Sequence, residues 1–254
     1  LLSPCCLIKQ HGERKDKFMD LKAKQSTNIG IVGLGLIGGS LALDLKDQGH
    51  QVHGLTHRKI TAQKAKERNL AQTISTEPKI LKNCSLIIIA LPLKQLLMPE
   101  KELIEALPKD AVITDVGSVK EKVLETWRDL HPRFIASHPM AGNDEAGVEA
   151  GKHNLFRNKP WITTPEKRSD PIALEIIHQL ALSLGSQWIT ADAYLHDQAV
   201  ALISHLPVFI SAALLQTASN EQDQSLLKLA QILASSGFED TTRVGGGNPE
   251  LGSS

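Results

Sequence analysis

Gly33-Leu34-Gly35-Leu36-Ile37-Gly38 fits the pattern G-x-G-x-x-G, and it lies between an apolar run at residues 29–32 and a helical pattern at 40–46. In such a turn the first glycine allows a sharp reversal, the second lets the backbone approach a pyrophosphate, and the third lets helix and strand pack closely. The N-terminus of the following helix offers free N–H groups to phosphate oxygens. The segment therefore predicts a dinucleotide site, with Gly33, Gly35, Leu36, Ile37 and Gly38 at the cofactor.

Strand and helix patterns alternate on the C-terminal side of this turn. The run Leu86-Ile87-Ile88-Ile89-Ala90 is continuously apolar, as expected for a strand of a parallel sheet that is buried on both faces. Further strands are expected over 51–56, 111–115, 134–137 and 187–190, and helices over 61–69, 95–107, 119–129 and 171–184. This order predicts an α/β fold with a doubly wound Rossmann-type sheet.

The strand signals stop near residue 190. Helical patterns follow over 191–219 and 224–235, with a kink expected at Pro207. The apolar stretch from Gln198 to Leu215 is shorter than the roughly 20 residues of a membrane span, so it is predicted to be a buried core helix. We expect a disordered tail at 1–26, a dinucleotide-binding Rossmann domain at 27–190 and an incomplete all-helical domain for substrate and dimerisation at 191–254.

The composition excludes several classes of function. The 254 residues hold 28 Lys and Arg against 28 Asp and Glu, so no basic surface indicates nucleic acid or an anionic membrane as a partner. Aromatic residues make up only 4%, and no spacing typical of metal ligands occurs. Three cysteines do not form a disulfide framework, which favours a reducing, cytoplasmic setting.

The end of the second strand indicates which dinucleotide binds. NAD enzymes usually carry an acidic residue there for the ribose 2′-hydroxyl, whereas this chain has Thr56, His57, Arg58 and Lys59. A guanidinium can hold a 2′-phosphate through its fork of donors. We therefore predict NADP rather than NAD, bound by Thr56, His57, Arg58 and Thr61 in addition to the glycine turn.

Three further side chains are candidates for the chemistry. His138 follows a strand at the edge where ligands bind in open α/β sheets, and imidazole titrates near neutral pH, which suits a general base. His205 precedes Pro207 in an apolar helix, which is typical either of a site wall or of an ordinary core histidine. Arg243 lies in a polar, glycine-rich stretch at 236–249, expected to be a loop, and could bind a carboxylate with two hydrogen bonds.

Six motifs together resemble the prephenate/arogenate dehydrogenase family of tyrosine biosynthesis, in particular its short cyanobacterial or plant-like arogenate type. They are GLGLIGGS (33–40), DVGSVK (115–120), SHPMAG (137–142), HD (196–197), SHLP (204–207) and RVGGGNP (243–249).

The resemblance implies an NADP-dependent oxidative decarboxylation of arogenate or prephenate, to tyrosine or 4-hydroxyphenylpyruvate. It implies that His138 accepts the proton of the ring hydroxyl, that Ser118 binds this hydroxyl and orients His138, that Arg243 holds the ring carboxylate and that His205 positions the substrate. It also implies a homodimer. Members of the family continue with further helices, so this chain, ending at Ser254, is expected to be truncated, and its dimerisation and activity are open.

Two alternatives stay open beside this interpretation. One is another NADP-linked two-domain dehydrogenase or reductase, such as one acting on 3-hydroxy acids, which would share the glycine turn but not explain His138 together with Arg243. The other is an inactive nucleotide-binding fragment or sensor. The choice between arogenate and prephenate is also open at this stage.

Overall fold

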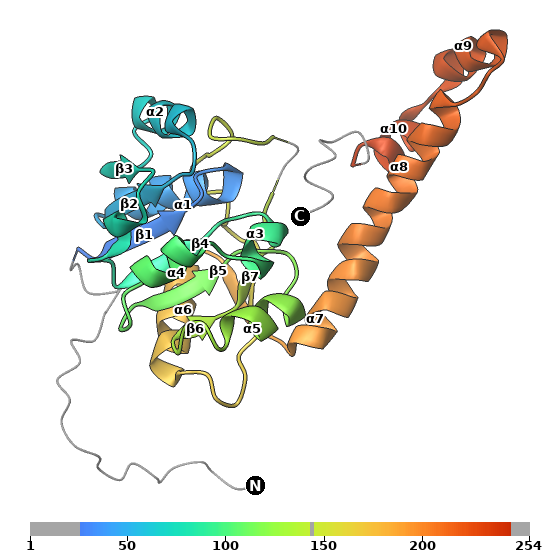
Figure 1. Ribbon diagram of the computed structural model, residues 1–254. Coiled ribbons are helices and arrows are strands. Elements are labelled where there is room, and N and C mark those ends of the chain that lie inside the picture. Colours follow the sequence, from blue (N-terminus) through green and yellow to red (C-terminus); the bar gives the residue numbers. More distant parts are fainter. Residues whose placement is uncertain (1–25, 143–144, 245–254) are drawn as a thin grey trace, which may run out of the picture.

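A six-stranded parallel sheet forms the centre of the computed structural model, which describes residues 26–142 and 145–244 (Figure 1). The strands run in the order β3-β2-β1-β4-β5-β6, which is the order of a doubly wound dinucleotide-binding sheet. Their bounds are Asn28–Val32 (β1), Gln51–Leu55 (β2), Thr73–Ser75 (β3), Leu86–Ile89 (β4), Val112–Asp115 (β5) and Phe134–Ile135 (β6). The predicted α/β fold is confirmed.

Helices cover both faces of this sheet. The helices α1 (Leu36–Asp47), α2 (Lys59–Glu67) and α6 (Pro171–Ser183) contribute to one apolar core. The other core holds α3 (Leu93–Leu97), α4 (Lys101–Ala106), α5 (Glu121–Trp127) and the 3-10 turn Pro78–Leu81. Alternate residues of β4 enter opposite cores, Leu86 and Ile88 on one face and Ile87 and Ile89 on the other. This explains why the strand is apolar throughout.

The strand expected over 134–137 is in fact two strands that belong to different sheets. β6 pairs with β5, and after Ala136 the chain enters a second sheet as β7 (Ser137–Pro139), antiparallel to β8 (Pro160–Thr163). The strand β9 (Gln187–Thr190) completes the small sheet. An apolar run indicates extended backbone but not its hydrogen-bonding partner, so the switch between sheets was not predictable from the pattern.

The prediction of a single helix over 95–107 is also wrong, because Pro99 separates two shorter helices, α3 and α4. Proline lacks the N–H of a helical bond and disfavours helical backbone in the residue before it. Met98 accordingly leaves the helical region, with φ −134° and ψ 66°.

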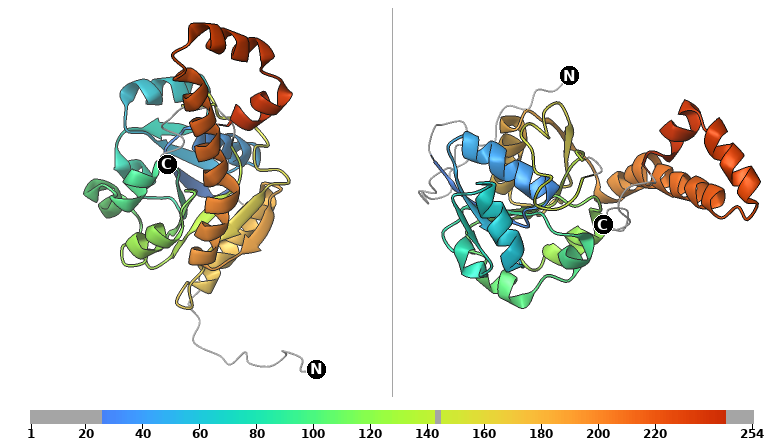
Figure 2. Two further views of the ribbon diagram at one scale, coloured as in Figure 1. Left: turned by 90° about the vertical axis from the view of Figure 1, so that its right-hand side faces the viewer. Right: turned by 90° about the horizontal axis from the view of Figure 1, so that it is seen from above.

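A helical arm follows β9 and projects away from the sheet (Figures 1 and 2). It begins with α7 (Ala193–Val200), passes through a π-helical turn (Ala201–His205) and continues as α8 (Leu206–Ser219), α9 (Gln224–Leu233) and α10 (Ser236–Thr242). The helical run continues through Pro207, with the irregularity placed in the π-helical turn before it. The loop expected from 236 is wrong in its first half, because α10 occupies residues 236–242. Residues 245–249 of that stretch, and residues 1–25 of the expected tail, lie outside the described residues.

The prediction that Gln198 to Leu215 is a buried core helix is also wrong. Leu202 and Phe209 are 67% and 70% exposed, and only 11% of the most apolar window in the run Ala193–Ser219 is buried. By length and composition alone this run could cross a membrane. Its first helix, α7, is nevertheless bound to the sheet domain, because Asp197 accepts hydrogen bonds from backbone N–H groups at the start of α5.

Candidate active site

The glycine turn between β1 and α1 has the geometry of a phosphate cradle. Gly33 has φ +92°, and a Cβ there would overlap the carbonyl oxygen of Ala90. A Cβ at Gly38 would overlap the carbonyl oxygen of Gly33, so the third glycine is required for close packing. A Cβ at Gly35, in contrast, would meet nothing within 4 Å. The turn thus has no room for a side chain at Gly33 or Gly38, whereas Gly35 faces open space from which a ligand can approach.

The open side leads to the N-terminus of α1. Gly35 is the N-cap and provides no side chain to bond the first N–H groups, which belong to Leu36 and Ile37. A strand order that reverses between β1 and β4 places this turn at the switch point of the sheet, where dinucleotides bind in such folds. The residues present therefore fit a dinucleotide pyrophosphate.

The end of β2 presents cationic groups to solvent beside this turn. Thr56 is buried and its N–H bonds the Ser75 carbonyl oxygen, whereas His57 and Arg58 are exposed. Arg58 is the N-cap of α2, with extended backbone and no side-chain cap bond. Thr61 is half-buried in the first turn of α2, and no carboxylate occurs from residue 56 to 61.

His138 lies in β7, with its side chain buried to 8% exposure. A buried ion pair between Lys120 and Asp115 fixes the start of this strand. Lys120 Nζ also donates to the Ser137 carbonyl oxygen at 2.7 Å, and Asp115 Oδ1 accepts from the Ser137 N–H at 3.1 Å. Because Asp115 ends β5, these bonds hold His138 at the carboxyl edge of the large sheet.

A second histidine from the arm contacts this first one. His138 Nδ1 is 2.9 Å from His196 Nε2, and His196 Nδ1 is 2.7 Å from Asp197 Oδ1. Asp197 in turn accepts bonds from the backbone N–H groups of Lys120 (2.8 Å) and Glu121 (2.9 Å), which begin α5. Two imidazoles and a carboxylate thus form one chain of hydrogen bonds between α7 and β7.

Burial lowers the pKa of His138 to about 3, with smaller contributions in the same direction from Lys120, His196 and His205. Burial also lowers the pKa of His196, although its bond to Asp197 acts in the opposite direction. Both imidazoles are therefore neutral at neutral pH. A neutral imidazole has one nitrogen that can accept a proton.

The other predicted residues lie at different distances from His138. Ser118 is half-buried in the loop from β5 to α5, two residues before Lys120. His205 is half-buried at the end of the π-helical turn and contributes to the lowered pKa of His138. Arg243 is exposed and directly follows α10, a helix of the arm that lies away from β7 (Figure 1).

Four residues that the structure places around His138 were not predicted as site residues from the sequence. They are Asp115, Lys120, His196 and Asp197, all of them inside the quoted motifs. A contact between residues 138 and 196 joins two elements far apart in the chain, and only the presence of two ionisable residues side by side in an apolar helix could have indicated it.

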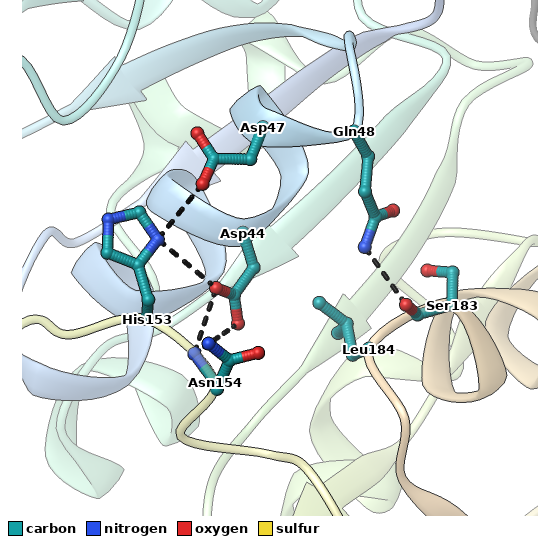
Figure 3. Close-up of a pocket in the computed structure, with 7 residues that line it drawn as sticks. All are labelled: Asp44, Asp47, Gln48, His153, Asn154, Ser183 and Leu184. Atoms are coloured by element: carbon teal, nitrogen blue, oxygen red, sulfur yellow. Dashed lines mark hydrogen bonds and ion pairs between the residues drawn. The ribbon is translucent and has the colours of Figure 1, made fainter.

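A separate hollow lies at the C-terminal end of α1, the end opposite to the glycine turn (Figure 3). Its polar groups bond one another: His153 Nδ1 is 3.1 Å from Asp47 Oδ2, and the Asn154 N–H donates to Asp44 at 3.0 Å. Gln48 Nε2 donates to the Ser183 carbonyl oxygen at 3.0 Å and so links α1 to α6. These bonds hold α6 and the loop that carries His153 and Asn154 against α1. Within residues 26–142 and 145–244, no group of three or more His, Cys, Asp or Glu side chains could hold a metal ion.

Comparisons with known proteins agree with this geometry. Residues 41–190 match the family of the prephenate dehydrogenase nucleotide-binding domain, and residues 192–254 match the prephenate dehydrogenase dimerization domain. A prephenate dehydrogenase of Bacillus subtilis is 31% identical over 228 residues, which are 87% of this chain and 61% of that protein. The chain thus spans less than two thirds of the length of this relative.

Two solved structures resemble the fold closely. Synechocystis arogenate dehydrogenase is 44% identical, with a TM-score of 0.75, over 89% of this chain and 81% of that one. Prephenate dehydrogenase from Aquifex aeolicus, solved with hydroxyphenyl propionate and NAD+, is 28% identical, with a TM-score of 0.81, over 90% and 81% of the two chains. From the two consecutive domain matches and these likenesses, the chain belongs to the prephenate dehydrogenase family.

Proposed function

We propose that this protein oxidatively decarboxylates a cyclohexadienol acid, arogenate or prephenate, with NADP as hydride acceptor. The observation that carries the proposal is a buried, neutral His138 at the carboxyl edge of a sheet whose glycine turn fits a dinucleotide. The Synechocystis and Aquifex relatives, named as arogenate and prephenate dehydrogenases, support the substrate class.

His138 acts as the general base in this proposal. Its unprotonated nitrogen takes the proton of the ring hydroxyl while hydride leaves the carbon that bears that hydroxyl. The bound nicotinamide supplies the acceptor for this hydride. The ring carbon becomes a ketone, and the C–C bond to the ring carboxylate then breaks with release of CO2. The electron pair of that bond makes the ring aromatic, and His138 returns its proton to the resulting phenolate oxygen.

Three other side chains complete the proposed pocket. Ser118 binds the substrate hydroxyl and orients His138, and His205 positions the substrate from the arm. Arg243 holds the ring carboxylate as a bidentate partner. Because α10, which Arg243 follows, lies on the arm and away from the sheet domain that holds His138, we infer that the pocket is completed in a homodimer (Figure 2).

We also propose that the second copy of the dimer buries the exposed apolar side chains of the arm. Exposed apolar side chains occur along α8 and α9, among them Phe209 and Ile232, each 70% exposed. The match of residues 192–254 to a dimerization domain supports a second copy as the partner. A small-molecule substrate without nucleic acid or membrane, in a reducing cytoplasmic compartment, is part of the same proposal, and the free, buried Cys84 agrees with it.

NADP is preferred over NAD in this proposal because of Arg58. Its exposed guanidinium lies at the end of β2, where no carboxylate from residue 56 to 61 would repel a 2′-phosphate. We expect Arg58→Ala to lower kcat/KM for NADP by about 10- to 150-fold, corresponding to the roughly 1.5–3 kcal/mol of a hydrogen bond to a charged group, and to leave kcat/KM for NAD unchanged. Initial rates with both cofactors test this, and a wild-type kcat/KM for NAD equal to or above that for NADP would contradict it.

The activity itself is tested by mixing the protein with arogenate or prephenate and either cofactor, and following the absorbance of the reduced nicotinamide. We expect turnover with at least one substrate, and the comparison also decides which one is preferred. Binding of NADP without turnover of either substrate would instead support the inactive or sensing alternative. Turnover retained in His138→Asn would show that another group is the base.

A further inference from the structure

We propose that His196, held by Asp197, is a positioning residue that sets the tautomer of His138, so that its Nδ1 carries the proton and its Nε2 carries the lone pair. The catalytic meaning of this inference rests on the proposed function, in which His138 is the base. The tautomer itself does not depend on that function. The consequence is that the arm, and not the Rossmann domain alone, prepares the base.

The direction of the hydrogen bonds follows from the donors and acceptors along the chain. An ionised carboxylate only accepts, so at 2.7 Å from Asp197 Oδ1 the His196 Nδ1 must carry a proton. A neutral imidazole has a single N–H, so His196 Nε2 is then an acceptor. At 2.9 Å from it, His138 Nδ1 must be the donor, which leaves the lone pair of His138 on Nε2.

The reverse direction is unfavourable. If His196 donated from Nε2 while neutral, the lone pair of its Nδ1 would face the Asp197 carboxylate at 2.7 Å, with two acceptors opposed and no proton between them. Only a doubly protonated His196 could bond both neighbours as a donor. Burial disfavours that charge, as the lowered pKa of His196 indicates.

Asp197 is itself fixed in place. Both of its carboxylate oxygens accept backbone N–H groups of α5, Oδ1 from Lys120 at 2.8 Å and Oδ2 from Glu121 at 2.9 Å. The carboxylate therefore cannot turn away from His196 without leaving two donors of α5 unbonded. This makes the orientation of His196 a property of the junction between α5 and α7.

The other charged groups around the two imidazoles support the same arrangement. Burial is the main cause of the lowered pKa of both imidazoles. Lys120, paired with Asp115, lowers the pKa of both and His205 lowers that of His138, whereas Asp197 and Asp115 act in the opposite direction on the pKa of His196. The net effect is that both imidazoles are neutral, so each carries a single N–H.

The tautomer can be measured directly in the full chain labelled with 15N-histidine, by the two-bond nitrogen–proton correlations of His138 at neutral pH. We expect a protonated Nδ1 and an unprotonated Nε2. In His196→Leu, which removes the acceptor, we expect a mixture of both tautomers. In His196→Gln, whose side-chain oxygen can accept the same bond, the wild-type tautomer should return. A protonated Nε2 in the wild type would overturn the proposal, and this reading requires no variant to fold.

Kinetics provide a second readout that a purely structural role would not move. We expect His196→Leu to lower kcat about tenfold or more, though less than the roughly 10²–10⁴-fold contributed by a general base, with little change in KM or in the Kd for NADP. His196→Gln should recover most of kcat. An unchanged kcat in a folded His196→Leu, or an equal loss in His196→Gln, would overturn the proposal. If no substrate is turned over, the proposed function falls, and the tautomer measurement still decides this inference.

Discussion

At the level of single residues, the site depends on keeping an imidazole neutral inside the protein. His138 is nearly covered, and Lys120, which holds its strand through the Ser137 carbonyl, also places a positive charge near it. Burial therefore keeps a lone pair of His138 free of solvent protons at neutral pH, and the same lowered pKa makes the imidazole a weaker base. Stability and reactivity are linked through this one group.

The lowered pKa of His138 predicts a pH dependence of stability. Because the folded pKa of about 3 is below the unfolded value near 6.5, the unfolded chain binds more protons in this interval, and the contribution present above pH 6.5 is lost as the pH falls. We expect the titration of His138 to lower the free energy of unfolding by about 1.4 kcal/mol for each unit by which the pH falls from 6.5 to 3.

Denaturant unfolding of the wild type and of His138→Gln, at one protein concentration and several pH values, measures this slope. Buried histidines away from this site contribute equally to both proteins, so the difference between the two slopes belongs to His138 together with its bonded partner His196. Identical slopes would contradict the prediction.

At the residue scale, the sequence singles out side chains next to a recognisable turn but not those that packing brings beside them. His138 was predicted as a site residue because it follows a strand at the edge where ligands bind. Its neighbour His196 is on another element, and no local pattern reports a contact over 58 positions. Arg243 was predicted for its chemistry, but its position depends on the path of the whole arm.

At the level of elements, the β1–α1 turn separates the requirements of folding from those of binding. Gly35→Ala adds a methyl group into open space, with φ −75° acceptable to alanine, so we expect an unchanged melting temperature. The methyl group occupies the approach of the pyrophosphate, and a steric cost of about 1–3 kcal/mol would raise the Kd for NADP roughly 5- to 150-fold.

Gly38→Ala is the matched control for this substitution. Its Cβ would overlap the carbonyl oxygen of Gly33, so here we expect a loss of stability of about 1–3 kcal/mol. Thermal unfolding and titration with NADP distinguish the two variants. A Gly35→Ala protein that binds NADP as well as the wild type would show that the pyrophosphate does not approach this glycine.

The sequence pattern predicted the parallel strands but not all boundaries between elements. The parallel strands were predicted because their apolar runs reflect burial on both faces, a local property. The division of 95–107 follows from Pro99, a local signal that helical periodicity outweighed. The division at Ala136 has no such signal, since β6 and β7 differ only in the strand each one pairs with.

At the level of the whole molecule, the arm carries apolar side chains on its exposed surface. From the sequence pattern alone, these side chains were expected to form a buried core. The interpretation was correct about the chemistry of the side chains and wrong about what covers them within one chain. We expect the full chain to be a dimer in solution. Phe209→Asp, which acts twice in a symmetric dimer, should cost about 3–6 kcal/mol and raise the dimer Kd roughly 10²- to 10⁴-fold.

Sedimentation measures this change, with Met98→Asp as the control. Met98 is 74% exposed but lies between α3 and α4, in the sheet domain and not on the arm, so its substitution should leave the dimer intact. A wild-type chain that stays monomeric, or that partitions into lipid vesicles instead of pairing, would contradict the assignment of the arm.

The bonds of Asp197 also determine where the chain can be cut. The two family matches meet at residue 191, just before α7, so a cut there would remove α7. That helix supplies the Asp197 carboxylate, which accepts N–H groups at the start of α5, and the His196 imidazole beside His138. A fragment ending there would keep the nucleotide cradle but lose both groups. The smallest piece that could be transplanted between relatives with its base intact therefore extends to Val200, the end of α7.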